Sequence, residues 1–406
     1  MTVKIAVLLG DGMSDVPLEA LGGKTPLEAA PTPHMDRLAR EGTLGRAVTV
    51  PEGLPAGSDV ANLSVFGYDP RQCYTGRAPL EAAAMGVELG PRDVAYRLNL
   101  VTLLAGTSAV YMDDFSAGHI SSEEAARILD TLAAGLGDNG FEFHAGVSYR
   151  HLLVWRDGLD GPRTTPPHDI LGRPIHEYLP RGDGADELVH LITGSQILLK
   201  NHPVNVARRE AGEKEANSIW LWGQGRPPRL PSYRERFGLR GAVISAVDLL
   251  KGIGRLAGLD AAPIAGATGY IDTDYEAKVR AALAALEEGD FAYLHVEGPD
   301  EAAHAGNLEH KLKAIADFDA RVVGPVRDGL EALGQPFVLL VLPDHPTPLP
   351  LRTHTAEPVP FALYRSDGAG RVPGRAFTER CAEETGVFVP LAYRLLEHAL
   401  GRVRLW

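Results

Sequence analysis

The sequence predicts an α/β protein in which a mostly parallel sheet lies between layers of helices and carries an inserted smaller α/β (α+β) domain. Three apolar runs, Lys4–Leu9, Phe291–Val296 and Pro336–Leu342, have the continuous hydrophobicity of strands that are buried on both faces. Helical patterns separate these runs, and alternating strands and helices are typical of α/β folds. The carboxyl ends of parallel strands meet at one edge of the sheet, where open α/β folds bind ligands.

The first domain begins with the strand at residues 4–9 and continues into a helix. Thr32 as N-cap, Pro33 in the first turn and Gly42 beyond the last turn delimit that helix. A short strand is expected over residues 45–50. Ser58 then begins a helix that stops at Gly67.

Residues 73–240 have a different hydrophobic pattern. Residues 94–103 alternate apolar and polar side chains, which predicts a half-exposed strand of antiparallel or edge type. Ser121 and Glu124 form a capping box for the next helix. Further strands are expected at residues 141–147, 151–155 and 218–222.

The continuous apolar runs that are typical of buried strands return at about residue 241. Thr273 and Glu276 predict a second capping box. The other elements expected here are a strand at 242–246, helices at 247–256 and from Asn307 to about Val326, a late strand at 359–364 and a closing helix at about 390–400. Because acids from both ends of the chain must meet at one sheet edge, residues 1–72 and 241–406 form one domain in this prediction, and residues 73–240 are the insertion.

Composition limits the class of function. A chain of 406 residues that is 45% hydrophobic and 23% charged is typical of a soluble globular protein with room for two domains. The net charge of −13 argues against general binding to nucleic acids or anionic membranes. Cys73 and Cys381 are far apart, which favours a reducing compartment. Without a signal peptide or an apolar run long enough to span a membrane, we expect a cytoplasmic protein.

Carboxylates and imidazoles follow the buried strands and form a candidate metal site. Asp300 and His304 are spaced i, i+4, so both can face one ion from a single helical turn. Carboxylate and imidazole ligands without thiolates suit Mn²⁺, Zn²⁺, Co²⁺ or Mg²⁺ better than a structural zinc site. The candidate ligands are Asp11, Asp300, His304, Asp344, His345 and His354.

Ser58 is the candidate nucleophile. It follows the flexible Gly57 at the start of a helix, where free backbone amides and the helix dipole suit an anion. A serine in this position is more often a simple N-cap. The distant metal-ligand candidates favour the catalytic interpretation, because their chemistry needs such a hydroxyl.

The chain resembles the archaeal type of cofactor-independent phosphoglycerate mutase, a branch of the alkaline phosphatase superfamily. The resemblance rests on motifs that follow in order along nearly the whole chain. They are LLGDGMSD (8–15), GSDVANLSVFGYDP (57–70), YTGRAPLEA (74–82), FSAGHIS (115–121), SYRHLLVW (148–155), PPHDILGRPI (166–175), IWLWGQG (219–225), GATGYIDTDYEAK (266–278), HVEGPDEAAH (295–304) and PDHPTP (343–348). Gly298 and the Ala302–Ala303 pair depart from the family pattern, but the ligand residues are intact.

The resemblance implies two divalent metal ions, commonly manganese, and no 2,3-bisphosphoglycerate. One ion would be held by Asp300, His304 and His354. The other would be held by Asp11, Asp344, His345 and the Ser58 oxygen. Ser58 would take the phosphoryl group of 3-phosphoglycerate and return it to the retained glycerate as 2-phosphoglycerate, a step of glycolysis and gluconeogenesis.

The insertion is the expected lid, which would exclude water and retain glycerate. Arginine forks suit its carboxylate and phosphate groups. Arg150 is the first candidate, His119 is a candidate acid/base, and Lys251 would contact the phosphate from the hinge. The remaining candidate substrate contacts are His151, Arg208 and Arg209, of which the last two are as easily a solvated face.

Other functions stay open at this point. A metal-dependent phosphatase or phosphodiesterase, or a mutase of another phosphate ester, would use the same residues. A non-catalytic binding protein would need no nucleophile beside a metal. A kinase is disfavoured because no Gly-x-x-x-x-Gly-Lys loop is present. The expected partner is a small-molecule phosphoglycerate substrate. The sequence leaves open whether the chain forms a homo-oligomer.

Overall fold

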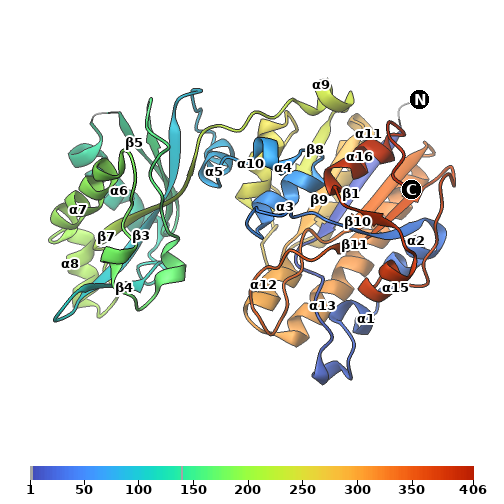
Figure 1. The fold of residues 1–406 in the computed structure, drawn as a ribbon, viewed down its shortest axis with the longest axis horizontal. Helices are drawn as coiled ribbons and strands as arrows, with labels where there is room; N and C mark the ends of the chain where they lie inside the picture. The colour runs from blue at the N-terminus through green and yellow to red at the C-terminus, as the bar shows by residue number, and fades with distance from the viewer. Residues whose placement is uncertain (1–2, 139) are drawn as a thin grey trace. The chain divides into compact units, whose positions relative to one another are not determined.

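The computed structural model describes residues 3–138 and 140–406, and the chain divides into two compact units (Figure 1). Unit 1 comprises the N-terminal segment up to Tyr74 together with Leu230–Trp406, and unit 2 comprises Thr75–Arg229. Residues 230–240, which we expected in the insertion, pack in unit 1. Their helix α9 (Tyr233–Phe237) is held there by the Tyr233 hydroxyl, which donates to the Phe66 carbonyl at 2.7 Å.

Unit 1 is built on a seven-stranded sheet in the order β12-β2-β11-β10-β1-β9-β8. The central strand β1 pairs in parallel with β10 and with β9, and β9 pairs in parallel with β8. Only β11 runs antiparallel to its neighbours β10 and β2. The predicted mostly parallel sheet is therefore confirmed. The strands are β1 (Lys4–Gly10), β2 (Thr43–Ala47), β8 (Gly241–Ile244), β9 (Phe291–Val296), β10 (Phe337–Leu342), β11 (Val359–Arg365) and β12 (Phe388–Val389).

Helices cover both faces of this sheet. Those of unit 1 are η1 (Glu19–Leu21), α1 (Pro26–Ala29), α2 (Pro33–Glu41), α3 (Ser58–Val65), α4 (Pro70–Cys73), α9, α10 (Asp248–Leu256), α11 (Tyr275–Glu288), α12 (Gly298–His304), α13 (Leu308–Phe318), η4 (Asp319–Val323), α14 (Gly324–Ala332), α15 (Glu379–Glu384), η5 (Ala392–Arg394) and α16 (Leu395–Ala399). No helix among the described residues is long and apolar enough to span a membrane.

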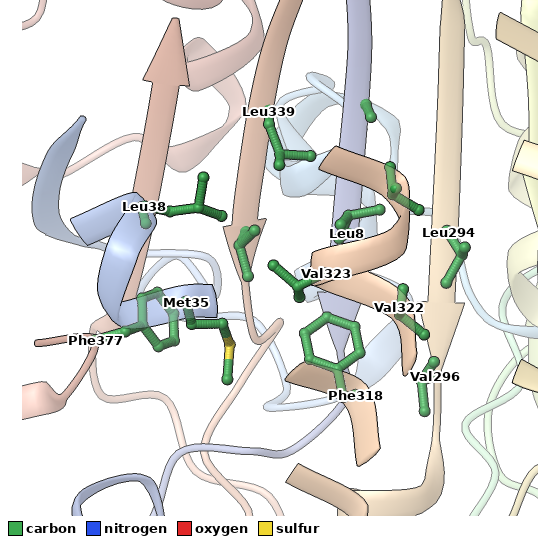
Figure 2. Packing of buried hydrophobic residues seen from close by; sticks show 14 of the residues in the cluster. Leu8, Met35, Leu38, Leu294, Val296, Phe318, Val322, Val323, Leu339 and Phe377 are labelled. Carbon is green, nitrogen blue, oxygen red and sulfur yellow. The ribbon is translucent and has the colours of Figure 1, made fainter. Parts of the chain in front are cut away.

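The main core of unit 1 lies between one face of the sheet and the helices α2, α11, α13, η4 and α14 (Figure 2). Leu8, Leu294 and Leu339 lie on three neighbouring strands and belong to one buried cluster with Phe318 and Val322 of the helical layer. All five side chains are completely buried. Burial of large apolar side chains is the main source of stability, so this contact fixes the central strands and the residues at their ends.

The long helix expected from Asn307 to Val326 is interrupted by a π-helical turn, η4. The turn includes Asp319, which is completely buried. Its carboxylate accepts hydrogen bonds from the backbone amides of His34 at 3.2 Å and Met35 at 2.7 Å. Asp319 therefore caps α2 in place of Thr32, whose side chain makes no capping bond.

Two further helix ends differ from the sequence-based expectation. The cap of α11 is Asp274, which accepts from Ala277, whereas the expected cap Thr273 accepts from Thr268. The closing helix at residues 390–400 is shorter and consists of η5 and α16.

Unit 2 contains a five-stranded antiparallel sheet, with α6 and α7 packed on one face and the short helix α5 on the other. The first part of strand β3 pairs with β6 along one edge and with β7 along the other. The last part of β3, from Thr102 to Ala105, pairs with β4. The elements are α5 (Ala78–Met85), β3 (Val94–Ala105), β4 (Val110–Asp114), α6 (Ser122–Leu136), β5 (Phe141–Val147), β6 (Arg150–Trp155), η2 (Pro167–Ile170), η3 (Ile175–Glu177), α7 (Ala185–Leu199), α8 (Pro203–Glu210) and β7 (Ser218–Gly225).

Strand β3 is antiparallel to all its partners, as one form of the prediction had it, but the prediction that it is half-exposed is wrong. Its apolar residues pack under α6 and α7, and its polar residues are buried on the other face. There Arg97 forms an ion pair with Glu81 at 2.9 Å and lies 4.2 Å from the ring of Trp222. Asn99 accepts a hydrogen bond from the Trp222 indole at 3.0 Å. The polar half of the alternating pattern therefore faces partners, not solvent.

Candidate metal centre and nucleophile

The acids and imidazoles that follow the strands of unit 1 converge. Asp11 directly follows β1, and Asp344 and His345 follow β10 after one residue. Helix α12, which carries Asp300, begins one residue after β9. Two groups have ligand atoms within 4.8 Å of one another and could each hold a metal ion. They are Asp11, Asp344 and His345, and Asp300, His345 and His354.

The first group contains two buried carboxylates. Asp344 is satisfied: Oδ1 accepts from the amides of Gly12 at 3.3 Å and His345 at 2.9 Å, and Oδ2 accepts from Asn62. Asp11 Oδ2 lies 2.8 Å from His295 Nε2, but its Oδ1 is buried without a hydrogen-bond partner among the described residues. Burial, together with the charge of Asp344, raises the pKa of Asp11 well above its usual range. A cation at Oδ1 would relieve this cost.

At the second group, the imidazoles of His354 and of His304, which lies beside the group, face the carboxylate of Asp300. His304 Nε2 lies 3.1 Å from Asp300 Oδ2 and 2.9 Å from His354 Nε2, which is 3.5 Å from Asp300 Oδ1. His304 Nδ1 lies 2.9 Å from the Arg352 carbonyl, so Nδ1 carries a proton and Nε2 is directed inward. Burial acts to raise the pKa of Asp300, but the two imidazoles hold it well below its usual range. The hydrogen bond to Asp300 raises the pKa of His304 to about 9.

Backbone shape also suits this site. Gly12 has a φ of 61°. A Cβ there would lie 2.6 Å from both Asp300 Oδ1 and Thr347 Oγ1, so only glycine fits between the strand end and these oxygens. Two imidazole-and-carboxylate groups, one with an orphaned oxygen, fit a hard or borderline divalent ion such as Mn²⁺.

Ser58 lies at the first position of α3, and its Oγ is 3.1 Å from His345 Nε2. Asn62, one turn later and completely buried, donates through Nδ2 to the Ser58 carbonyl and to Asp344 Oδ2, both at 2.8 Å. The Tyr293 hydroxyl of β9 donates to Asn62 Oδ1 at 2.5 Å. The start of α3 is thus tied to the first ligand group.

The candidate substrate residues lie in different environments. His119 and Arg150 are exposed, and the guanidinium of Arg150 lies 5.4 Å from the Tyr149 ring. His151 is only 4% exposed, its Nδ1 accepts from the Gly146 amide, and burial lowers its pKa to about 4. The buried ring of His151 offers no surface to a ligand. Lys251 belongs to α10 of unit 1 and pairs with Asp248 at 2.6 Å.

Arg208 is buried and holds a loop. Its guanidinium donates to the carbonyls of Ala117 and Lys214 and to the carboxylate of Glu124. With its fork occupied by internal partners, Arg208 supports the loop that carries His119. Arg209 is exposed and pairs with Glu215 at 2.7 Å.

Sequence reasoning did not find several residues that support the ligands, namely Asn62, Ser245, Tyr293, His295 and Thr347. His295 lies inside an apolar strand run, where a histidine is usually a core residue. Thr347 Oγ1 donates to Asp300 Oδ1 at 2.5 Å and lies 3.2 Å from His345 Nδ1. The sequence offers a positional signal for two of them, since Ser245 directly follows β8 and Asn62 lies one helical turn from Ser58.

Comparison with known proteins connects this geometry to a family. Residues 39–205 match the family model of 2,3-bisphosphoglycerate-independent phosphoglycerate mutase. The chain is 58% identical to a Geobacter sulfurreducens protein described as a "probable 2,3-bisphosphoglycerate-independent phosphoglycerate mutase", over 98% of this chain and 100% of that protein. It is 54% identical to the mutase of that name from Methanosarcina barkeri, over 94% and 95% of the two chains.

A solved structure agrees. The fold matches the cofactor-independent phosphoglycerate mutase of Thermoplasma acidophilum with a TM-score of 0.66 at 25% identity, over 99% of both chains. Near-complete coverage at more than half identity confirms the predicted family. The chain belongs to the 2,3-bisphosphoglycerate-independent phosphoglycerate mutases.

Proposed function

We propose that this phosphoglycerate mutase interconverts 3-phosphoglycerate and 2-phosphoglycerate in the cytoplasm, in glycolysis and gluconeogenesis, through a phosphoserine at Ser58 and with two divalent metal ions. The observation that carries the proposal is the 3.1 Å approach of Ser58 Oγ to His345 Nε2. His345 belongs to both groups of candidate ligands, so the hydroxyl lies where a phosphoryl group would be clamped.

We assign one ion to Asp300, His304 and His354, and the other to Asp11, Asp344, His345 and the Ser58 oxygen. Mn²⁺ is the proposed metal because the family resemblance implies it, and Mg²⁺, Co²⁺ and Zn²⁺ are the alternatives that suit the same donor set. When bound, two such ions would neutralise charge on the phosphoryl oxygens and lower the pKa of the Ser58 hydroxyl.

The chain's own residues then carry the transfer. Ser58 Oγ forms a bond to phosphorus as the bond to the glycerate 3-oxygen breaks, and the proton that leaves Ser58 ends on that oxygen. The positive end of the α3 dipole favours the phosphoserine. The 2-hydroxyl oxygen of the retained glycerate then forms a bond to phosphorus as the bond from phosphorus to Ser58 Oγ breaks, and the proton of that hydroxyl ends on Ser58 Oγ.

Unit 2 is the proposed source of substrate contacts and of water exclusion. Ala117, Gly118 and His119 are three successive residues with left-handed backbone, at φ of 47°, 65° and 53°. Two of these are not glycine, so the turn costs energy, and such strain is commonly kept at functional sites. Ser116 Oγ accepts from the His119 amide at 3.1 Å and helps to fix the turn.

Arg150 is the proposed carboxylate or phosphate ligand of unit 2, because its guanidinium is exposed and can bind either group bidentately. His119 is the proposed acid/base for the glycerate hydroxyls. Lys251 remains a proposed phosphate contact, provided that it can leave Asp248.

The test follows metal-stripped protein and 3-phosphoglycerate by ³¹P NMR, before and after Mn²⁺ is added. We expect 2-phosphoglycerate to appear only with metal and with little inorganic phosphate. Phosphate without the isomer would replace the mutase with a metal-dependent phosphatase or phosphodiesterase on the same fold. Isomer formation that persists in chelator would overturn the metal mechanism.

A further inference from the structure

We propose that His295, with Ser245 behind it, is a positioning residue that directs the free oxygen of Asp11 toward the metal. The inference rests on the metal binding proposed above. It concerns a residue that contacts a ligand, not the substrate or the metal itself.

His295 is the penultimate residue of β9 and is completely buried. Its Nε2 is 2.8 Å from Asp11 Oδ2, and its Nδ1 is 3.1 Å from the hydroxyl oxygen of Ser245. Ser245 follows β8 and accepts a hydrogen bond from the Val247 amide at 2.9 Å. Val247, Ser245, His295 and Asp11 thus form one chain of hydrogen bonds that crosses three parallel strands.

We assign the direction of this chain from its two ends. The Val247 amide can only donate to Ser245 Oγ, and an ionised Asp11 Oδ2 can only accept, so His295 Nε2 carries the proton between them. In this assignment the Ser245 hydroxyl donates its proton to His295 Nδ1. A neutral imidazole that accepts at Nδ1 carries its proton at Nε2, and this proton is donated to Asp11 Oδ2.

The main chain of His295 is held in place as well as its ring. Lys278 Nζ donates to the His295 carbonyl at 3.2 Å, so it also holds the backbone of this residue.

The consequence for Asp11 is that its two oxygens are unequal. Oδ2 is held by His295, and the carboxylate plane is thereby fixed. Oδ1 remains buried and unpaired among the described residues, 3.6 Å from His345 Nε2. The geometry points to Asp11 as a ligand through Oδ1 alone, oriented before any ion arrives. Partners of this kind typically change metal affinity 10- to 100-fold when they are removed.

Two substitutions of His295 separate positioning from packing. The amide nitrogen of His295→Gln can reach the place of Nε2 and donate to Asp11, whereas that of His295→Asn reaches only the place of Nδ1. Mn²⁺ binding to the metal-stripped, full-length protein is measured by calorimetry, and thermal unfolding is followed alongside. We expect His295→Asn to weaken Mn²⁺ binding about 10- to 100-fold, and His295→Gln to restore it to within about threefold of the wild type.

A further variant, Ser245→Ala, removes the residue that contacts His295 and not Asp11 itself. Without the serine donor, the ring can adopt the Nδ1-protonated form, which cannot donate to Asp11. We expect Mn²⁺ affinity to fall severalfold, while Ser195→Ala, which removes an equally buried hydroxyl in unit 2, leaves it unchanged. This pair decides the question where a His295 variant does not fold.

The outcomes are distinct. If the wild-type protein binds Mn²⁺ and the affinity falls equally in His295→Gln and His295→Asn, the loss reflects packing and the inference is wrong. Unchanged affinity in His295→Asn, or in Ser245→Ala, would also overturn it. Wild-type protein that binds no Mn²⁺ would overturn the proposed metal centre, and this inference with it.

Discussion

Ser58 and His345 are 287 positions apart in the sequence, yet Ser58 Oγ lies 3.1 Å from His345 Nε2. The contact joins the start of α3 to the end of β10. It is the point where the candidate nucleophile meets the candidate metal centre, and the first prediction concerns it.

Ser58→Ala should lower kcat by several orders of magnitude, because the hydroxyl that accepts the phosphoryl group is gone. The fold and most of the bound metal should remain. Ser64→Ala is the matched control on the same helix, since the Ser64 hydroxyl is buried without a hydrogen-bond partner among the described residues. Steady-state turnover and metal content check both variants. Substantial turnover by the Ser58 variant would exclude the phosphoserine route.

Tyr293→Phe should impair activity through Asn62. The substitution leaves Asn62 Oδ1 without its donor, and Asn62 holds both Ser58 and Asp344. Tyr233→Phe is the control, because it removes an equally buried hydroxyl that donates to the Phe66 carbonyl. Each should lose about 1–3 kcal/mol of unfolding free energy. Only Tyr293→Phe should also lower kcat, by about tenfold, and equal kinetic effects would refute a specific role for Asn62.

Unit 2 should lose stability in acid through His151. Its pKa is about 4 in the folded state because of burial, and about 6.5 in the unfolded state. The unfolded chain therefore binds the extra proton between these values, so this contribution is complete above pH 6.5 and is lost as pH falls toward 4. The loss is about 3 kcal/mol.

Urea unfolding of wild type and His151→Gln between pH 4 and 7 measures this difference. The exposed His190 provides the control substitution, His190→Gln, which should keep the wild-type slope. The prediction fails if His151→Gln follows the wild-type curve throughout.

Removal of metal should destabilise unit 1. Free Mn²⁺ at about 100 times its dissociation constant should add about 2.7 kcal/mol to the unfolding free energy, because ions bind the assembled ligands and not the separated ones. Chelator should reverse the effect and abolish turnover, and added Mn²⁺ should restore both. Asp344→Asn should show little response to Mn²⁺ in the same melting experiment. A wild-type melting temperature that is indifferent to Mn²⁺ and chelator would contradict the proposed centre.

The central strands of unit 1 could be predicted because each is a continuous apolar run. The acids and imidazoles at their ends were predicted for the same reason, since parallel strands bring such ends together. His295 was missed because it lies inside a run, and only its distance to Asp11 reveals its partner. Asn62 was missed because its helix gives no sign of what lies opposite.

The errors elsewhere have similar causes. Arg97 and Asn99 have the spacing of an exposed strand face, but Glu81 and Trp222 bury them. The π-helical turn from Asp319 to Val323 ends directly before Gly324 and Pro325, and the side chain of Asp319 is bound by the distant backbone amides of His34 and Met35. In both cases, partners distant in sequence decided the local environment.

The discontinuity of unit 1 has a consequence for how the chain is made. Gly12 donates to Asp344 across 332 intervening sequence steps, and both sheet neighbours of β1 come from the last third of the chain. At about 5–20 residues per second, β1 waits roughly 17 seconds or longer on the ribosome for β10. Unit 2, which has a hydrophobic core of its own, is synthesised completely well before then. The apolar first strand is therefore the segment most in need of a chaperone during synthesis, and slower translation would lengthen its exposure.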